Sequence, residues 1–180
     1  KGLDEHSFGV KSFERSFELR QSFEKRIEQK LKNSRTQREG DFHIVIGGAG
    51  LSGVEIAAEM AYTLKKFKKI LGNHAKSIHI TLVDASSTIL PGLDPYLIEK
   101  SEKRLRSLGV NILTDAFIDV VEERKIYFKD GASLAYDYMI FTGGIESNDL
   151  TRSLGEKTNK IGQLIVDERL RVGTHENVYA

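Results

Sequence analysis

Residues 41–55 read DFHIVIGGAGLSGVE, and this stretch decides the fold. Its first six residues are apolar enough for a strand that is buried on both faces of a parallel sheet. Gly47–Gly53 follows as a glycine-rich loop. Val54–Leu71 has the composition of a helix, which Gly72 and Asn73 would end. The order of strand, glycine loop and helix predicts the first half of a strand–helix–strand unit.

The residues that follow complete this unit. Ser77–Asp84 predicts a second strand. Asp94 is placed as the N-cap of a second helix, with Pro95 at its first position and Gly109 as its C-terminal cap. Val110–Ala116 then predicts a third strand.

The pattern changes after residue 116. Asp130-Gly131 is a hairpin signal, and the last of the following strands brings Tyr138–Thr142 back to the sheet. A further strand pair is predicted at Gln163–Val172. The short strands between these signals are predicted at Ile118–Glu122, Lys125–Lys129 and Leu134–Thr142.

The amino-terminal residues predict one long helix over Val10–Gln37. Apolar side chains recur there within a stripe about 140° wide at 100° per residue. We expect this stripe to pack on a neighbouring surface. Its members are Val10, Phe13, Phe17, Phe23, Ile27 and Leu31. The predicted fold class is therefore α/β: a Rossmann-like dinucleotide-binding domain, with a parallel sheet and an antiparallel β-meander, preceded by a long amphipathic helix.

Composition excludes several classes of protein. The chain has 180 residues and a formal net charge of +1, so no overall charge attracts it to nucleic acid. It has no cysteine, which rules out a disulfide scaffold, a cysteine-ligated metal site and a CxxC redox pair. We find no signal peptide and no apolar run long enough to span a membrane, so we expect a cytoplasmic location.

The glycine loop fits G-x-G-x-x-G in the strand-to-helix context that the motif requires. Gly48 permits the tight turn, Gly50 lets a pyrophosphate approach the backbone, and Gly53 lets the helix lie close to the strand. The helix N-terminus then offers N–H groups and partial positive charge to the phosphates. A Walker loop is excluded because no Gly-Lys-Ser/Thr follows, and the meander argues against an S-adenosylmethionine site.

An acid at the end of the second strand completes this fingerprint, and Asp84 occupies that place. We expect it to accept hydrogen bonds from the adenosine ribose. No Lys or Arg occurs between Asp84 and Lys100, so nothing there would neutralise a 2′-phosphate. The sequence therefore favours NADH over NADPH.

Two further places complete the candidate site. Glu55 stands in the predicted first turn of the helix; it either complements the helix dipole alone or orients the nicotinamide end of the cofactor. Thr142-Gly143-Gly144 ends the returning strand, where open α/β sheets bind ligands, although a simple loop is the alternative. The predicted cofactor-binding residues are Gly48, Ala49, Gly50, Leu51, Ser52, Gly53, Glu55, Asp84, Ala85, Thr142, Gly143 and Gly144.

No catalytic or metal-ligating residue is assigned. The five histidines show no ligand spacing. Tyr62 with Lys66, and Tyr96 with Lys100, match the Tyr-x-x-x-Lys pair of short-chain dehydrogenases, but both lie in early helices far from the expected site. We interpret both matches as chance.

From the glycine loop onward the chain resembles a known family. Ile46–Met60 is similar to the second glycine motif of flavoproteins with two dinucleotide-binding domains, and above all to type II NADH dehydrogenases, where Gly-Gly-Gly-Pro-Thr-Gly-Val-Glu stands. Ala49 and Leu51 replace a glycine and the proline. Further similar stretches are Lys1–His6, Lys11–Glu14, Thr81–Ala85, Ile89–Asp94, Leu105–Val110, Phe128–Gly131 and Tyr136–Gly144.

This resemblance implies an FAD-dependent pyridine nucleotide oxidoreductase in which hydride passes from NADH to FAD and then to a quinone. The chain matches only the NADH-binding domain, so we expect an inactive fragment whose FAD site lies elsewhere in a parent protein. The implied parent is peripheral on the cytoplasmic face of a membrane. The implied boundaries are a helical connecting segment at 1–40, the NADH-binding domain at 41–172 and the return to a missing FAD domain at 173–180.

Two alternatives stay open at this point. A ferredoxin or nitrite reductase of the same superfamily shares the motif, and a non-catalytic dinucleotide-sensing module would show the same glycine loop. We also expect a homodimer through the 1–40 helix, because its phenylalanines exceed what monomers leave exposed.

Overall fold

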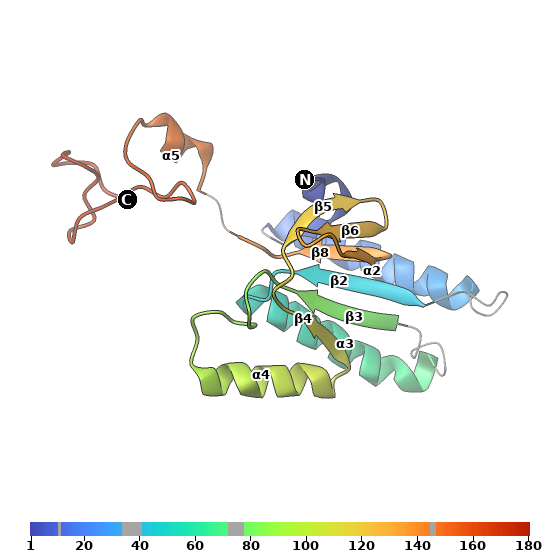
Figure 1. The fold of residues 1–180 in the computed structure, drawn as a ribbon. Coiled ribbons are helices and arrows are strands. Elements are labelled where there is room, and N and C mark those ends of the chain that lie inside the picture. Colours follow the sequence, from blue (N-terminus) through green and yellow to red (C-terminus); the bar gives the residue numbers. More distant parts are fainter. Residues whose placement is uncertain (11, 34–40, 72–77, 145–146) are drawn as a thin grey trace. The chain divides into compact units, whose positions relative to one another are not determined.

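The computed structural model describes residues 1–10, 12–33, 41–71, 78–144 and 147–180. Two compact units are present, Lys1–Gly143 and Gly144–Ala180. The first contains the parallel sheet, its covering helices and the meander, and the second is a short loop-rich unit (Figure 1).

A five-stranded parallel sheet forms the centre of the first unit. Its strands lie in the order β1-β8-β2-β3-β4, so the chain runs outward from β2 in one direction and returns to the opposite side of β2 as β8. The sheet order therefore reverses beside β2, which is where open α/β sheets bind ligands. The strands are β1 (Phe8–Gly9), β2 (Phe42–Gly47), β3 (Ile78–Val83), β4 (Val110–Leu113) and β8 (Tyr138–Phe141).

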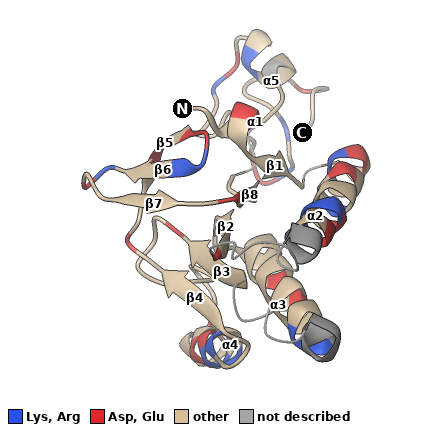
Figure 2. Ribbon diagram, turned by 90° about the vertical axis from the view of Figure 1, so that its right-hand side faces the viewer, with Lys and Arg blue, Asp and Glu red and all other residues tan. Residues whose placement is uncertain are grey.

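Strand β2 shows why this sheet is buried on both faces. Ile44 and Ile46 point into one apolar cluster, whereas Val45 between them belongs to another, and each is at most 1% exposed. Fully burying such a side chain stabilises the fold by about 1.5–3 kcal/mol. Figure 2 shows that the charged residues lie outside the strands of this sheet, which carry none.

Three helices cover one face of the sheet. They are α2 (Phe13–Asn33), α3 (Leu51–Leu71) and α4 (Pro95–Ser107). Ala57 and Ala61 of α3 and Leu105 of α4 are buried in the same cluster as Ile44 and Ile46. The small alanines let α3 lie close to the strands.

The opposite face is covered by an antiparallel meander of β5 (Ile118–Glu122), β6 (Lys125–Phe128) and β7 (Ser133–Ala135). Val121, Ile126 and Phe128 of the meander pack against Val45 and Met139 of the central sheet. This packing explains why the chain alternates apolar and polar residues in the meander but not in the central strands.

The predicted fold class is confirmed, and several local expectations need correction. The amino-terminal helix begins at Phe13 rather than Val10, because a short helix α1 (Leu3–His6) and strand β1 precede it. Strand β1 pairs with β8, with Phe8 opposite Ile140, and thereby widens the parallel sheet. The predicted continuation to Gln37 and the predicted helix end at Gly72 and Asn73 lie outside the described residues.

The single strand predicted over Leu134–Thr142 is two strands in different sheets. Tyr136 and Asp137 separate β7 from β8, and each is held by its own partners: the Tyr136 hydroxyl donates to the Glu122 carbonyl at 2.8 Å, and the Asp137 carboxylate accepts from the His43 N–H at 2.9 Å. These side-chain bonds turn the chain from the meander into the main sheet.

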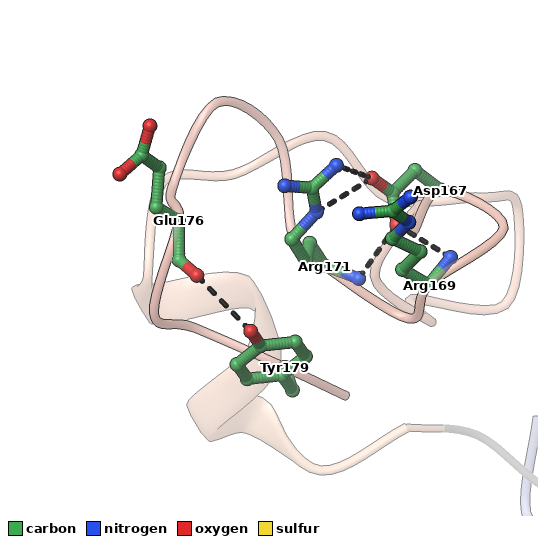
Figure 3. A network of polar contacts seen from close by, with 5 residues as sticks. All are labelled: Asp167, Arg169, Arg171, Glu176 and Tyr179. Carbon is green, nitrogen blue, oxygen red and sulfur yellow. Dashed lines mark hydrogen bonds and ion pairs between the residues drawn. The ribbon is translucent and has the colours of Figure 1, made fainter.

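The second unit has a single helix among its described residues, α5 (Asp149–Ser153), and is otherwise built from turns. The predicted strand pair at Gln163–Val172 appears only as isolated bridges, one of which joins Val166 to Val172. Side-chain bonds replace a sheet here: Asp167 accepts from the N–H groups of Arg169 and Arg171 and from the Arg171 guanidinium at 2.9 Å (Figure 3).

Candidate functional site

The glycine loop joins β2 to α3 at the carboxyl end of the sheet. Gly48 has a φ of +102°, a conformation that glycine adopts without strain, and its N–H donates to the Val83 carbonyl at 2.8 Å. A Cβ on Gly48 would lie 2.8 Å from the Thr142 hydroxyl, and one on Gly53 would collide with the Gly48 carbonyl oxygen. Both glycines are therefore required by the protein itself.

Gly50 differs from these two glycines. A Cβ built on it meets no described atom within 4 Å, and its φ lies outside the left-handed region. Neither packing nor backbone strain within the described protein explains why this position lacks a side chain. The open space beside Gly50 is where a ligand would approach the backbone.

Helix α3 begins directly after this open space. The first intrahelical bond runs from the Val54 N–H to the Gly50 carbonyl at 3.0 Å. By helix geometry, the N–H groups of Leu51, Ser52 and Gly53 have no partner within the helix. Leu51 and Ser52 are exposed, so partial positive charge and free donors are accessible at this end.

Asp84 lies at the exit of β3, beside the glycine loop. One oxygen of its carboxylate accepts from the Ala49 N–H at 2.5 Å, and the other accepts from the Ser86 N–H at 2.7 Å. The side chain is half-buried, and the neighbouring Ala85 is exposed. The structure thus brings the predicted acid and the predicted glycine loop into direct contact.

The end of β8 meets the same loop. Thr142 donates its hydroxyl to the carbonyl of Gly48 at 2.9 Å or of Gly47 at 3.1 Å, and its N–H also donates to Gly47. The ring of Phe141 lies where a Cβ of Gly143 would stand. Gly144 begins the second unit, so its predicted contact with a cofactor stays a prediction.

Glu55 stands one turn later than expected. Because α3 begins at Leu51 rather than Val54, Glu55 is its fifth residue, and the first turn contains no acid. The side chain is exposed, and no hydrogen bond or ion pair joins it to any other described residue. The dipole of the first turn therefore does not account for Glu55, and its role at the nicotinamide end of the cofactor stays a prediction.

Several contacts of the site were not anticipated from the sequence. The Leu90 N–H donates to the Ala49 carbonyl at 2.7 Å, and the Asp115 N–H donates to the Ser86 carbonyl at 2.9 Å. These are backbone bonds between loops that are distant in sequence, and no side-chain pattern signals them. The sequence indicates only the neighbouring bond from the Ser86 N–H to the Asp84 carboxylate, because an Asp side chain often accepts from the N–H two residues later.

The two Tyr-x-x-x-Lys matches are surface packing. The Lys66 ammonium lies 4.3 Å from the ring centre of Tyr62, and Lys100 lies 5.1 Å from that of Tyr96. Both are i,i+4 neighbours on exposed helix faces, the geometry of a cation–π pair. Within the described ranges, no cluster of His, Asp or Glu is suited to a metal ion, and no helix there could cross a membrane.

A separate cavity of about 580 Å³ opens at the amino-terminal end of β8, and none of the predicted site residues lines it. Its wall carries charges of both signs, contributed by Arg15, Arg26, Arg124, Glu18 and Asp137. The glycine loop remains the candidate site.

Comparison with known proteins identifies the family. The model of the pyridine nucleotide-disulphide oxidoreductases matches residues 6–180. The chain belongs to this family. It is similar to the type II NADH:quinone oxidoreductase of Haemophilus influenzae, with 26% identity over 160 residues that cover 87% of this chain and 35% of that protein.

Two further likenesses cover the whole chain. A probable mitochondrial NADH-ubiquinone oxidoreductase of Schizosaccharomyces pombe is 30% identical over 191 residues, covering 99% of this chain and 34% of that protein. The fold matches the structure of NDH2 from Plasmodium falciparum in complex with NADH, with a TM-score of 0.83 at 22% identity, over 100% of this chain and 39% of that one. The family member described here thus spans about a third of the length of its curated relatives.

Proposed function

We propose that this chain is the NADH-binding part of an FAD-dependent NADH dehydrogenase of the type II NADH:quinone oxidoreductases. The observation that carries the proposal is the open space beside Gly50, where a Cβ would meet no described atom within 4 Å. This space adjoins the N–H groups at the start of α3, and the preceding residue, Ala49, is bonded to the Asp84 carboxylate. The names of the relatives support the same assignment.

Each part of the site has a distinct task in this proposal. Gly48–Gly53 presents backbone N–H groups to the pyrophosphate, and Asp84 together with Ala85 lies beside the adenosine ribose. Glu55, Thr142, Gly143 and Gly144 lie toward the nicotinamide half. When bound, NADH would supply a hydride to the FAD of the parent; the two electrons and one proton of that hydride, with one further proton from solvent, would then reduce a quinone.

The chain itself supplies position rather than chemistry. No acid, base or nucleophile is assigned, because the reacting atoms belong to the two cofactors. We propose that residues 41–172 form the NADH-binding domain, that 1–40 connects to it, and that 173–180 leads back toward the FAD domain. The parent is then peripheral on the cytoplasmic face of a membrane, and the chain alone has no dehydrogenase turnover.

We further propose that the chain associates as a homodimer through α2. Phe13 and Phe17 at the start of this helix are 81% and 51% exposed, and their rings stack with centroids 6.4 Å apart. Adjacent aromatic side chains left open to water are characteristic of an interaction surface.

The direct test is calorimetric titration of the 180-residue chain with NADH, NADPH and NAD⁺. We expect NADH to bind, and NADPH to bind at least about tenfold more weakly, a difference of about 1.4 kcal/mol. The 2′-phosphate of NADPH would face the Asp84 carboxylate without a nearby cation. Equal binding of NADH and NADPH would remove the role of Asp84, and no binding of either would remove the proposal.

A substitution at Gly50 tests whether the ligand uses the open space beside it. The Cβ that Gly50→Val adds would meet no described atom within 4 Å, so the thermal midpoint should hold while NADH binding falls by at least about tenfold. Ala132→Val is the matched control, because Ala132 is exposed in the turn between β6 and β7. Unchanged NADH affinity in Gly50→Val would show that the opening is not used.

A further inference from the structure

We propose that Asp84 anchors the glycine loop, so that one carboxylate shapes the pyrophosphate cradle as well as facing the ribose. This inference rests on the proposed function, since it concerns the same nucleotide site. Its structural basis is the bond from the Ala49 N–H to the Asp84 carboxylate, at 2.5 Å.

Ala49 is held from two sides at the exit of β3. Its N–H donates to Asp84, and its carbonyl accepts from the Leu90 N–H at 2.7 Å. Ala49 is 1% exposed, whereas Gly50 directly after it is exposed. The bonds to Asp84 and Leu90 are therefore the last fixed points of the chain before the N–H groups that would meet a pyrophosphate.

The carboxylate has the capacity for both tasks. An ionised carboxylate offers about four lone-pair sites. The N–H groups of Ala49 and Ser86 use one on each oxygen, and so about two sites remain. Two is the number of hydroxyl groups on the adenosine ribose, so anchoring the loop and accepting from the ribose are compatible.

The same two bonds prevent Asp84 from moving aside. A 2′-phosphate would be tolerated if the carboxylate could rotate away from it, but rotation would break the bonds to Ala49 and Ser86. Bonds of this kind, from N–H groups to an ionised acceptor, are stronger than neutral ones. Discrimination against a 2′-phosphate is thus built into the shape of the loop.

Loss of the anchor and loss of the charge have opposite effects on a pyrophosphate ligand. Removing a negative charge near an anion should strengthen binding by Coulomb's law. Removing the anchor should weaken binding, because the loop then has to be ordered when the ligand binds. The sign of the change therefore separates the two roles of the acid.

The decisive probe is 2′,3′-dideoxyadenosine 5′-diphosphate, which carries a pyrophosphate but neither ribose hydroxyl. We would measure its affinity and that of ADP by calorimetry for the wild type, Asp84→Asn and Asp115→Asn. Asp115 is the matched control: it lies in the adjacent loop, its side chain makes no hydrogen bond to another described residue, and its φ of +54° suits Asn equally.

We expect Asp84→Asn to bind the dideoxy probe about tenfold more weakly than the wild type, because its single accepting oxygen cannot serve both the Ala49 and the Ser86 N–H groups and its NH2 is then directed at one of them. Asp115→Asn should bind it equally or slightly better. If Asp84→Asn binds the dideoxy probe as well as the wild type but binds ADP more weakly, the acid acts on the ribose alone and the anchor is wrong. Failure of the wild type to bind ADP or NADH would instead reject the proposed function.

A second measurement covers the case in which Asp84→Asn does not fold. In the wild type without nucleotide, a bond to an ionised carboxylate should shift the Ala49 amide proton strongly downfield in the NMR spectrum, unlike that of Gly50. An Ala49 resonance at the position of an unbonded amide would overturn the anchor.

Discussion

The two ends of strand β8 contact two regions, the glycine loop and helix α2, whose positions are fixed by different kinds of contact. At its carboxyl end, Thr142 bonds the glycine loop, whose shape is fixed by positions where a side chain cannot fit. At its amino end, Tyr138 holds α2, whose position is fixed by contacts that are distant in sequence. Its hydroxyl donates to the Leu19 carbonyl at 3.0 Å, and its ring stacks on Phe8 with centroids 4.8 Å apart.

This difference predicts how each region responds to substitution. A single substitution of a glycine in the loop should destabilise the fold strongly, because the neighbouring backbone carbonyl or N–H group cannot move to make room for a side chain. The α2 contact should lose stability gradually, in proportion to the apolar surface that each side chain buries. The four predictions that follow test this contrast, from the largest expected effect to the smallest.

Gly53→Ala should have the largest effect. The added methyl group would collide with the Gly48 carbonyl oxygen, a backbone atom held within the turn, so either α3 or the loop has to shift. We expect a loss of about 3 kcal/mol in the free energy of unfolding, the upper part of the range for overpacking. Urea unfolding followed by circular dichroism measures it.

Gly50→Ala is the matched control for that variant, since its methyl group meets no described atom. Its free energy of unfolding should stay within about 0.5 kcal/mol of the wild type. Equal losses in the two variants would mean that the loop does not depend on the close approach of Gly53 to Gly48.

The same contrast explains what could be predicted from the sequence. The strand, the glycine loop and Asp84 follow from local rules, because glycine positions and a buried apolar run carry their meaning within a few residues. The N-cap Asp94 belongs to the same group: its side chain accepts from the Tyr96 N–H at 2.9 Å, as the Asp-Pro pair predicts.

Other features had no local signal. Strand β1 is two residues long and exists because β8 offers an open edge to Phe8 and Gly9. The break between β7 and β8 depends on bonds from Tyr136 and Asp137 to remote partners. The sequence predicts the start of α3 three residues late, at Val54 rather than Leu51, because Gly50 and Gly53 lower the helix propensity around its first turn.

Alkaline pH should affect the α2 contact next most strongly. Burial raises the pKa of Tyr138 to about 12, from an ordinary value of 10.0. Below pH 10 the hydroxyl is protonated in both states, and its contribution to stability is fully present. Between pH 10 and 12 only the unfolded chain loses the proton, so we expect a loss of about 2–3 kcal/mol in the free energy of unfolding.

Tyr138→Phe tests the assignment, because it removes the group that titrates. It should cost about 1 kcal/mol at neutral pH through the lost bond to Leu19. Its alkaline loss should be smaller than that of the wild type, although not zero, because burial also raises the pKa of Tyr136. An unchanged slope between pH 10 and 12 would assign the loss to other groups.

Phe23→Ala should weaken the α2 contact by a smaller amount. The half-buried ring packs on the main core and meets Tyr138 edge-on, with centroids 5.8 Å apart. We expect a loss of about 2 kcal/mol, below the range for a fully buried phenylalanine. Phe17→Ala on the same helix is the control, because its ring is 51% exposed. If both variants lost the same free energy, α2 would not pack on the sheet through Phe23.

The smallest effect on stability belongs to the exposed start of α2. Replacing both Phe13 and Phe17 by Ser should change the free energy of unfolding by no more than about 0.5 kcal/mol, because neither ring belongs to the core. The same double variant should convert the proposed dimer to a monomer, which sedimentation equilibrium measures directly. Leu97→Ser on α4 is the control, since Leu97 is also 50% exposed but lies on another helix. A monomeric wild type at high protein concentration would remove the dimer while leaving the nucleotide site untouched, because none of the predicted cofactor-binding residues lies on α2.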